Sequence, residues 1–116
     1  MTIEQWLGAD NESGARIWHK KYQHKDETFD QWLDRVSGGR PELRELIESK
    51  KFLFGGRTLA NRGLHTDGSY FNCYSRGFIQ DDYKDIMQAM VDIGLTFNVQ
   101  GVPGISLSKL LPKGYP

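Results

Sequence analysis

The sequence of 116 residues has room for one domain at most, because domains usually hold roughly 100 to 150 residues. Its fifteen basic and fifteen acidic side chains balance, and neither sign forms a long run, which argues against a nucleic-acid interface. A single cysteine excludes an internal disulfide and argues against a four-ligand zinc site. With no apolar run of the roughly 18 residues that a membrane helix needs, we expect a soluble cytoplasmic protein.

Residues 1–51 are predicted to form a helical N-terminal region. Capping boxes, in which a Thr is followed three residues later by a Gln, predict helix starts at Thr2 and Thr28. Between them, the stretch "GARIWHKKY" places Ile17, Trp18 and Tyr22 on one helical stripe.

The helix that follows Thr28 carries apolar residues at helical spacing and is predicted to end at Gly38-Gly39. Pro41, a residue favoured in the first turn, then begins another helix, "PELRELIESKK". The first half of the chain is therefore predicted to be helical.

Residues 52–116 are predicted to hold a strand, a turn, a second strand, a long helix and a glycine turn. "FLF" at 52–54 is too short for a helix and indicates a strand or an extended segment that enters a Gly-Gly turn. The aromatic stretch "SYFNCYSRGFI" indicates the next strand, in which the period of two places Cys73 and Ser75 on one face.

Asp81 and Asp82 are candidate N-caps of a helix that runs to about Phe97. The Met-rich apolar stripe of this helix is typical of a core, and it also suits a homodimer formed through helix 82–97. A glycine turn at 101–104 is then expected to lead into a strand in "ISLS". The predicted fold class is α+β, mainly α-helical with two or three short strands.

Several motifs have an ordinary structural explanation beside a functional one. Cys73 fits a buried small hydrophobe or a reactive thiol. The "GGR" segment fits a surface turn or a turn whose backbone N–H groups contact a phosphate. His19, His24 and His65 lack the spacing of metal ligands, so we assign them surface or capping roles and predict no metal site.

Four segments in order resemble the N-terminal part of the catalytic subunit of ribonucleotide reductases. They are "KKYQHKDETFDQWLDRVS", "FLFGGRTLANRG", "FNCYS" ahead of the acid-capped helix, and the glycine-containing close "QGVPGISLSKLLPKG". The resemblance extends from about Ala15 to Gly114 and is strongest to the adenosylcobalamin-dependent class II enzymes, although class I enzymes share the layout. It implies that the chain is the N-terminal piece of the reductase α/β barrel.

The resemblance also implies roles for individual residues. Cys73 matches one cysteine of the redox pair that reduces the ribose 2′-carbon. The other implied positions are in the substrate site, with Thr58, Asn72 and Gly104, and in the effector-nucleotide site, with Asp81 and Asp82. The implied partners are nucleotides and the remainder of a reductase catalytic chain, and the implied cofactor of the complete enzyme is adenosylcobalamin.

In the family, the radical cysteine, the second redox cysteine and the acid–base carboxylate lie beyond the matched region, so we expect no catalysis by this chain alone. The chain also departs from the family pattern at Val102, Pro103 and Leu111, where a glycine run and an arginine are usual. Two alternatives stay open: an inactive nucleotide-binding or dimerising remnant, and a helical domain in which Cys73 is simply buried.

Overall fold

The computed structural model describes residues 1–65 and 68–115 and has an α+β fold that is about half helical with two short strands. The chain forms two compact units, Met1–Thr66 (unit 1) and Asp67–Pro116 (unit 2). The sequence boundary between residues 51 and 52 falls inside unit 1, so residues 52–65 cluster with the N-terminal helices. No helix in the described part of the chain combines the length and apolar character needed to cross a bilayer.

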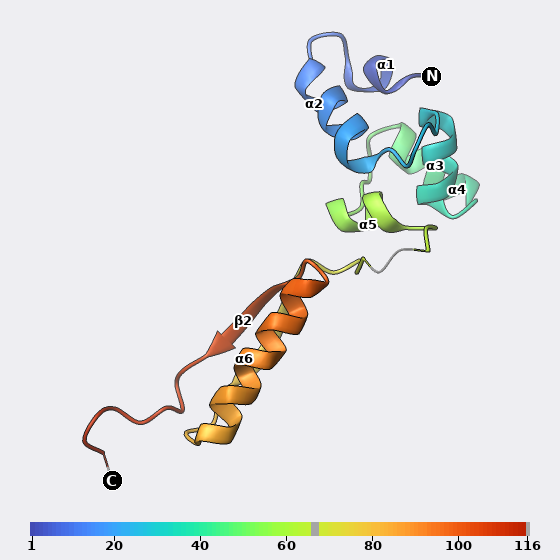
Figure 1. Cartoon of the computed structure of the whole chain (residues 1–116). Helices are drawn as coiled ribbons and strands as arrows, with labels where there is room; N and C mark the ends of the chain where they lie inside the picture. The colour runs from blue at the N-terminus through green and yellow to red at the C-terminus, as the bar shows by residue number, and fades with distance from the viewer. Residues whose placement is uncertain (66–67, 116) are drawn as a thin grey trace. The chain divides into compact units, whose positions relative to one another are not determined.

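Unit 1 is built from short helices that lie close together (Figure 1). They are α1 (Ile3–Leu7), α2 (Glu12–Ile17), α3 (Phe29–Ser37), α4 (Pro41–Glu48) and α5 (Gly56–Asn61), together with a π-helical segment, η1 (Trp18–Tyr22). The predicted helix in "GARIWHKKY" is present, but its second half is wound as a π-helix. Ile17 is exposed, whereas Trp18 is buried, so the predicted apolar stripe is only partly correct.

The predicted helix boundaries of unit 1 are confirmed at four places. Both capping boxes form, since the Thr2 and Thr28 hydroxyls each accept from the backbone N–H three residues on and the glutamine there accepts from the threonine N–H. Gly38 ends α3 in the left-handed conformation with φ of 66°. Pro41 begins α4 as its first residue.

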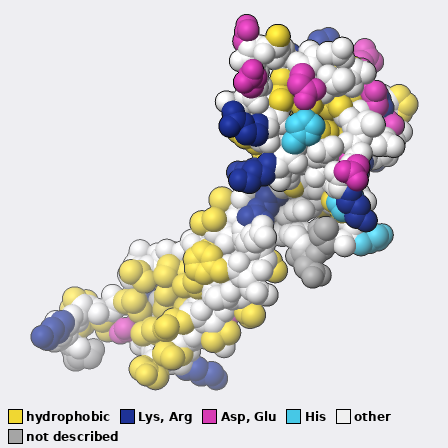
Figure 2. Space-filling model, turned by 45° about the horizontal axis from the view of Figure 1, so that its top comes forward, with side chains coloured by type: hydrophobic (Ala, Val, Ile, Leu, Met, Phe, Trp, Pro, Cys, Tyr) yellow, Lys and Arg dark blue, Asp and Glu magenta, His cyan; other side chains and the backbone are white. Residues whose placement is uncertain are grey.

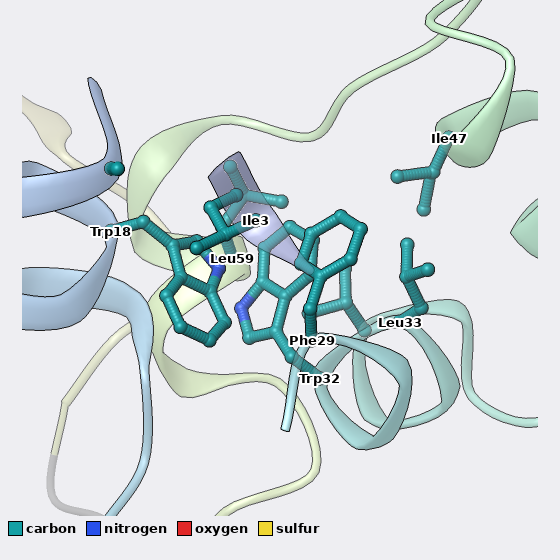
Figure 3. Close-up of a cluster of buried hydrophobic side chains, with 9 residues drawn as sticks. Ile3, Trp18, Phe29, Trp32, Leu33, Ile47 and Leu59 are labelled. Carbon is teal, nitrogen blue, oxygen red and sulfur yellow. The ribbon is translucent and has the colours of Figure 1, made fainter. Parts of the chain in front are cut away.

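The core of unit 1 is a cluster of aromatic and aliphatic side chains (Figure 3). The Phe29 and Trp32 rings stack with centroids 5.5 Å apart, and the Trp18 ring meets Trp32 edge-on at 6.0 Å. The buried members are Ile3, Ala15, Trp18, Phe29, Trp32, Leu33, Val36, Ile47 and Leu59. Unit 1 therefore encloses a core of its own.

A largely buried ion pair joins α3 to the rest of unit 1. Arg35 and Glu27 meet through two bonds of 2.6 and 3.0 Å, and the two side chains are only 11% and 12% exposed. Arg35 also donates to the backbone oxygens of Tyr22 and Arg62, at 3.1 and 2.8 Å. One guanidinium thus links α3 to η1 and to the end of α5.

Residues 52–54, predicted to be a strand or an extended segment, do not form a strand in the described structure. These residues have no sheet partner in the described structure, and the predicted Gly-Gly turn is instead the start of α5, with Gly55 as its N-cap. No side chain caps this helix, which is why the sequence carries no helix-start signal here.

Unit 2 is a strand–helix–strand unit: β1 (Cys73–Phe78), α6 (Tyr83–Asn98) and β2 (Val102–Ser106). The two strands pair in parallel, with Cys73 opposite Val102 and Ser75 opposite Gly104, and α6 packs on both strands. Figure 1 shows β2 beside α6. A bulge interrupts the register between Ser75 and Gly77.

The predicted turn at 101–104 is wrong in position, because β2 already begins at Val102 and includes Gly104. The left-handed residue of the connection is Gln100, with φ of 61°. The Val102 N–H donates to the Asn72 oxygen at 2.7 Å, so Val102 takes part in the strand pairing. Val102 and Pro103, which stand where the family pattern has a glycine run, therefore occupy a strand and not a turn.

Candidate functional site

The sheet of unit 2 has one covered face and one open face. Tyr74 and Arg76 of β1 are half-buried on the side of α6. The alternate residues are exposed on the other side, as the period of two requires. We call these residues the open face: Cys73, Ser75, Val102 and Gly104.

Cys73 is exposed at the start of β1. The prediction that it shares a face with Ser75 is confirmed, since both are exposed and the residue between them is not. The alternative in which Cys73 is simply buried is wrong for this chain. An accessible thiol is the first requirement for redox chemistry.

Two of the predicted site residues, Cys73 and Gly104, lie on the open face, and Asn72 adjoins it. Asn72 immediately precedes Cys73, and its carbonyl accepts from the Val102 N–H. Gly104 pairs with Ser75, two residues along the strand from Cys73. A Cβ added at Gly104 would meet only the Tyr74 backbone oxygen, at 3.5 Å, which is an ordinary contact. Close packing therefore does not require a glycine here. The lack of a side chain keeps the open face flat at this position.

The remaining predicted site residues are not brought to the open face. Asp81 and Asp82 follow the opposite end of β1, where Asp82 caps α6 by accepting from the Asp85 N–H at 2.9 Å. This confirms the predicted N-cap. Thr58 is half-buried on α5 and belongs to unit 1.

An ion-pair network fastens the covered face to α6, and the sequence analysis missed it. Arg76 donates to Asp85 at 2.7 Å and to Asp92 at 2.8 Å. Hydrogen bonds to Asp85 first, and then to Asp92, raise the pKa of Arg76. The seven-residue spacing of the two aspartates, which places both on one helix face, was the available signal.

The same network lowers the pKa of both carboxyl groups. The hydrogen bond from Arg76 is the main cause for Asp85, and the Gln80 backbone N–H adds to it. For Asp92 the hydrogen bond from Gln88 comes first, followed by Arg76. Both aspartates therefore form ion pairs with Arg76 that hold α6 against β1.

Unit 2 exposes a large amount of apolar surface. Figure 2 shows hydrophobic side chains gathered over it. The exposed large side chains of its described part are Tyr70, Phe71, Phe78, Tyr83, Met87, Met90, Val91, Leu95, Phe97, Val102, Ile105, Leu107, Leu111 and Tyr115. Exposure on this scale marks an interaction surface.

The sheet of unit 2 is also incomplete by itself. Each of its two strands has one edge without a partner among the described residues. Parallel sheets occur almost only where both faces are covered, and two strands alone are marginally stable. The geometry fits a unit that is completed by further polypeptide.

The His19 side chain makes hydrogen bonds within unit 1. His19 pairs with Gln23 at 2.9 Å and with Glu4 at 3.1 Å, and these bonds raise the pKa of His19. The described residues contain no group of three or more His, Cys, Asp or Glu side chains placed to hold a metal ion.

No protein-family model matches the chain, and a search of curated proteins finds no match.

Proposed function

We propose that this chain is an N-terminal piece of a ribonucleotide reductase catalytic subunit, most like the adenosylcobalamin-dependent enzymes. It would contribute to ribonucleotide reduction only together with the remainder of a reductase chain. The observation that carries the proposal is the exposed thiol of Cys73, which follows Asn72 and lies on the same open face as Gly104. The order of the sequence motifs supports the same assignment.

In this proposal Cys73 is one thiol of the redox pair. Reduction of the ribose 2′-carbon oxidises two cysteine thiols to a disulfide, and the 2′-hydroxyl leaves as water. The second thiol, the radical cysteine and the acid–base carboxylate would come from the remainder of the reductase. Cys73 must therefore face polypeptide outside unit 2, and its exposure on the open face allows this.

The residues of this chain do not fit adenosylcobalamin. Two pockets of unit 1, both lined by Trp6 and Leu7, have volumes of about 400 and 200 Å³, which is small beside a corrin macrocycle. The cofactor would therefore be held by the remainder of the enzyme.

Reconstitution tests the proposal. The chain is mixed with a class II catalytic chain that lacks its N-terminal region, and deoxynucleotide formation is measured with adenosylcobalamin, ribonucleotide and dithiol. Turnover should depend on this chain, disappear with Cys73→Ser and persist with Ser75→Ala, a matched change on the same face. If the chain restores no turnover, or if Cys73→Ser stays active, the role of Cys73 is refuted.

The alternative is an inactive remnant that binds nucleotide or dimerises, and one observation favours dimerisation. Exposed residues of α6 recur at spacings of four and three: Tyr83, Met87, Met90, Gly94 and Phe97. This is the repeat of a helix–helix seam. Sedimentation equilibrium should show a dimer that Met90→Glu dissociates, whereas a monomer at all concentrations refutes this alternative.

A further inference from the structure

An open pocket of unit 1 combines apolar side chains with two lysines, and the proposed function does not use it. Its volume is about 400 Å³, and none of the described residues that line it is acidic. We call it the basic pocket. Its lining includes Trp6, Leu7, Phe52, Leu53, Lys50 and Lys51.

The apolar wall of the basic pocket continues into a second pocket of about 200 Å³. The two pockets share Trp6, Leu7 and Leu53 in their linings. Leu53 is 52% exposed, and Phe52 of the first pocket and Ile17 of the second are exposed as well. Large apolar side chains that are exposed together mark a surface that binds apolar groups.

The two lysines give this surface a local positive charge. The Lys50 ammonium lies 5.4 Å from the centroid of the Trp6 ring. None of the ion pairs in the described part of unit 1 includes Lys50 or Lys51. The nearby Glu48 carboxylate lies 3.8 Å from the Arg44 guanidinium instead. The basic pocket therefore favours a ligand with negative charge.

Lys50 occupies a backbone position that suits glycine better than lysine. It follows α4 with φ of 61°, in the left-handed region where glycine is usual after a helix. Its N–H donates to the Ile47 oxygen at 3.0 Å, and the Lys51 N–H donates to the Leu46 oxygen at 2.9 Å. Such strained positions are often found at functional sites.

The character of the surface points to a short acidic segment of polypeptide. The chain has no net charge, whereas nucleic acids and anionic membranes are bound by broad basic surfaces. Two adjoining apolar pockets can each accept one side chain of the same peptide. In the described part of the chain, the backbone N–H and carbonyl of Leu53 have no hydrogen-bond partner, so a peptide backbone can pair with them.

We propose that the basic pocket and its neighbour bind an acidic peptide segment that carries two apolar side chains. The apolar side chains enter the two pockets, and the carboxylates lie near the Lys50 and Lys51 ammonium groups. The site lies within unit 1 and does not depend on Cys73 or on the proposed function.

A titration of the full chain, followed by NMR of the Trp6 indole N–H signal, tests the site. The probe is acetyl-Asp-Asp-Leu-Asp-Phe-Asp-Asp-amide. One matched peptide has asparagine in place of every aspartate, and another has alanine in place of leucine and phenylalanine. The probe should shift the Trp6 signal and saturate, with an affinity about three to ten times that of the asparagine peptide, as exposed ion pairs allow. The alanine peptide should bind more weakly than the probe, and added sodium chloride should weaken binding of the probe alone.

Variants of the lysines sharpen the assignment. Lys50→Gly suits the left-handed backbone and should keep unit 1 folded, yet it should weaken probe binding about threefold, as should Lys51→Gln. Lys21→Gln, at an exposed position outside both pockets, should leave binding unchanged.

Three outcomes would overturn the proposal. The first is equal affinity for the probe and the asparagine peptide, or no shift of the Trp6 signal with either. The second is binding of naphthoate, a small aromatic acid, as tightly as the probe, which would mean a small-molecule site. The third is a response of the Trp6 signal to anionic phosphatidylserine vesicles but not to the probe, which would mean a membrane surface.

Discussion

The two units of this chain differ in how much apolar surface they bury for themselves. Unit 1 encloses nine buried apolar residues around the Trp18, Phe29 and Trp32 rings. In the described part of unit 2 the only buried apolar side chains are Ile79 and Ala89, while its helix and strands expose large ones. Unit 1 has the core of an independent folding unit, whereas the described part of unit 2 leaves most of its large apolar side chains exposed.

The difference shows that regular secondary structure does not by itself make a stable unit. α6 is the longest helix of the described structure and the strands are well paired, yet hydrophobic burial supplies most of the free energy of folding. All three tryptophans lie in unit 1, so tryptophan fluorescence reports the unfolding of unit 1 alone. The two units can therefore be measured separately.

The largest expected effect comes from breaking the buried ion pair of unit 1. Arg35→Gln leaves the Glu27 carboxylate without its partner and should lower the free energy of unfolding by about 3 to 5 kcal/mol. Urea denaturation followed by tryptophan fluorescence measures the loss. Arg16→Gln, at an exposed position of α2, is the control and should change stability little. Equal effects of the two changes would contradict the assigned role of Arg35.

A matched pair of leucines compares the units directly. Leu33 of α3 is completely buried, so Leu33→Ala should cost about 2 to 5 kcal/mol of unit 1 stability in urea denaturation. Leu95 of α6 is 63% exposed, so Leu95→Ala should change the stability of the chain by no more than about 0.5 kcal/mol. A large effect of Leu95→Ala in the isolated chain would mean that unit 2 buries this side chain after all.

A matched pair of glycines tests the packing inside unit 2. A Cβ at Gly101 would lie 2.5 Å from a ring carbon of Tyr74 and 2.8 Å from the Thr96 methyl, so Gly101→Ala should destabilise unit 2 by about 1 to 3 kcal/mol. Gly104→Ala meets only an ordinary contact and should be tolerated. Hydrogen exchange of the β1 and β2 amides measures both. Equal protection in the two variants would refute the close approach at Gly101.

The smallest expected effects are on the pH dependence of stability, which should have opposite directions in the two units. The raised pKa of His19 means that its contribution in unit 1 is fully present below pH 6.5 and is lost as the pH rises through the folded value. The lowered pKa of Asp85 means that its contribution in unit 2 is present above pH 3.8 and is lost as the pH falls through the folded value.

NMR titration of the two side chains checks both directions. Glu4→Gln should move the pKa of His19 part of the way back, because the bond to Gln23 remains. For Asp85 the matched change is Arg76→Gln, which should raise its pKa. A His19 pKa below 6.5 in the unmodified chain, or an Asp85 pKa that does not respond to Arg76→Gln, would contradict these contacts.

Local signals in the sequence were the ones that predicted structure correctly. The capping boxes at Thr2 and Thr28, the stop at Gly38 and the cap at Asp82 depend on residues a few positions apart, and all form. The start of α5 lacks such a signal, because Gly55 caps it without a side chain.

Features that depend on distant residues were missed. The start of β2 at Val102 is set by pairing with Asn72 and Cys73, which lie about 30 residues earlier in the chain. The exposure of Cys73 likewise depends on what covers the sheet, which its local sequence does not encode. The edge-on contact between the Trp18 and Trp32 rings likewise requires the packed positions of two separate helical segments.

Hydrogen exchange of the isolated chain, measured with and without a class II catalytic chain that lacks its N-terminal region, tests the central claim most directly. Alone, the amides of α3 should exchange slowly and those of β1 and β2 quickly. Addition of the catalytic chain should slow exchange in β1 and β2 and leave α3 unchanged. Protection of β1 and β2 equal to that of α3 in the isolated chain, at every protein concentration, would show that unit 2 is complete and would contradict the account.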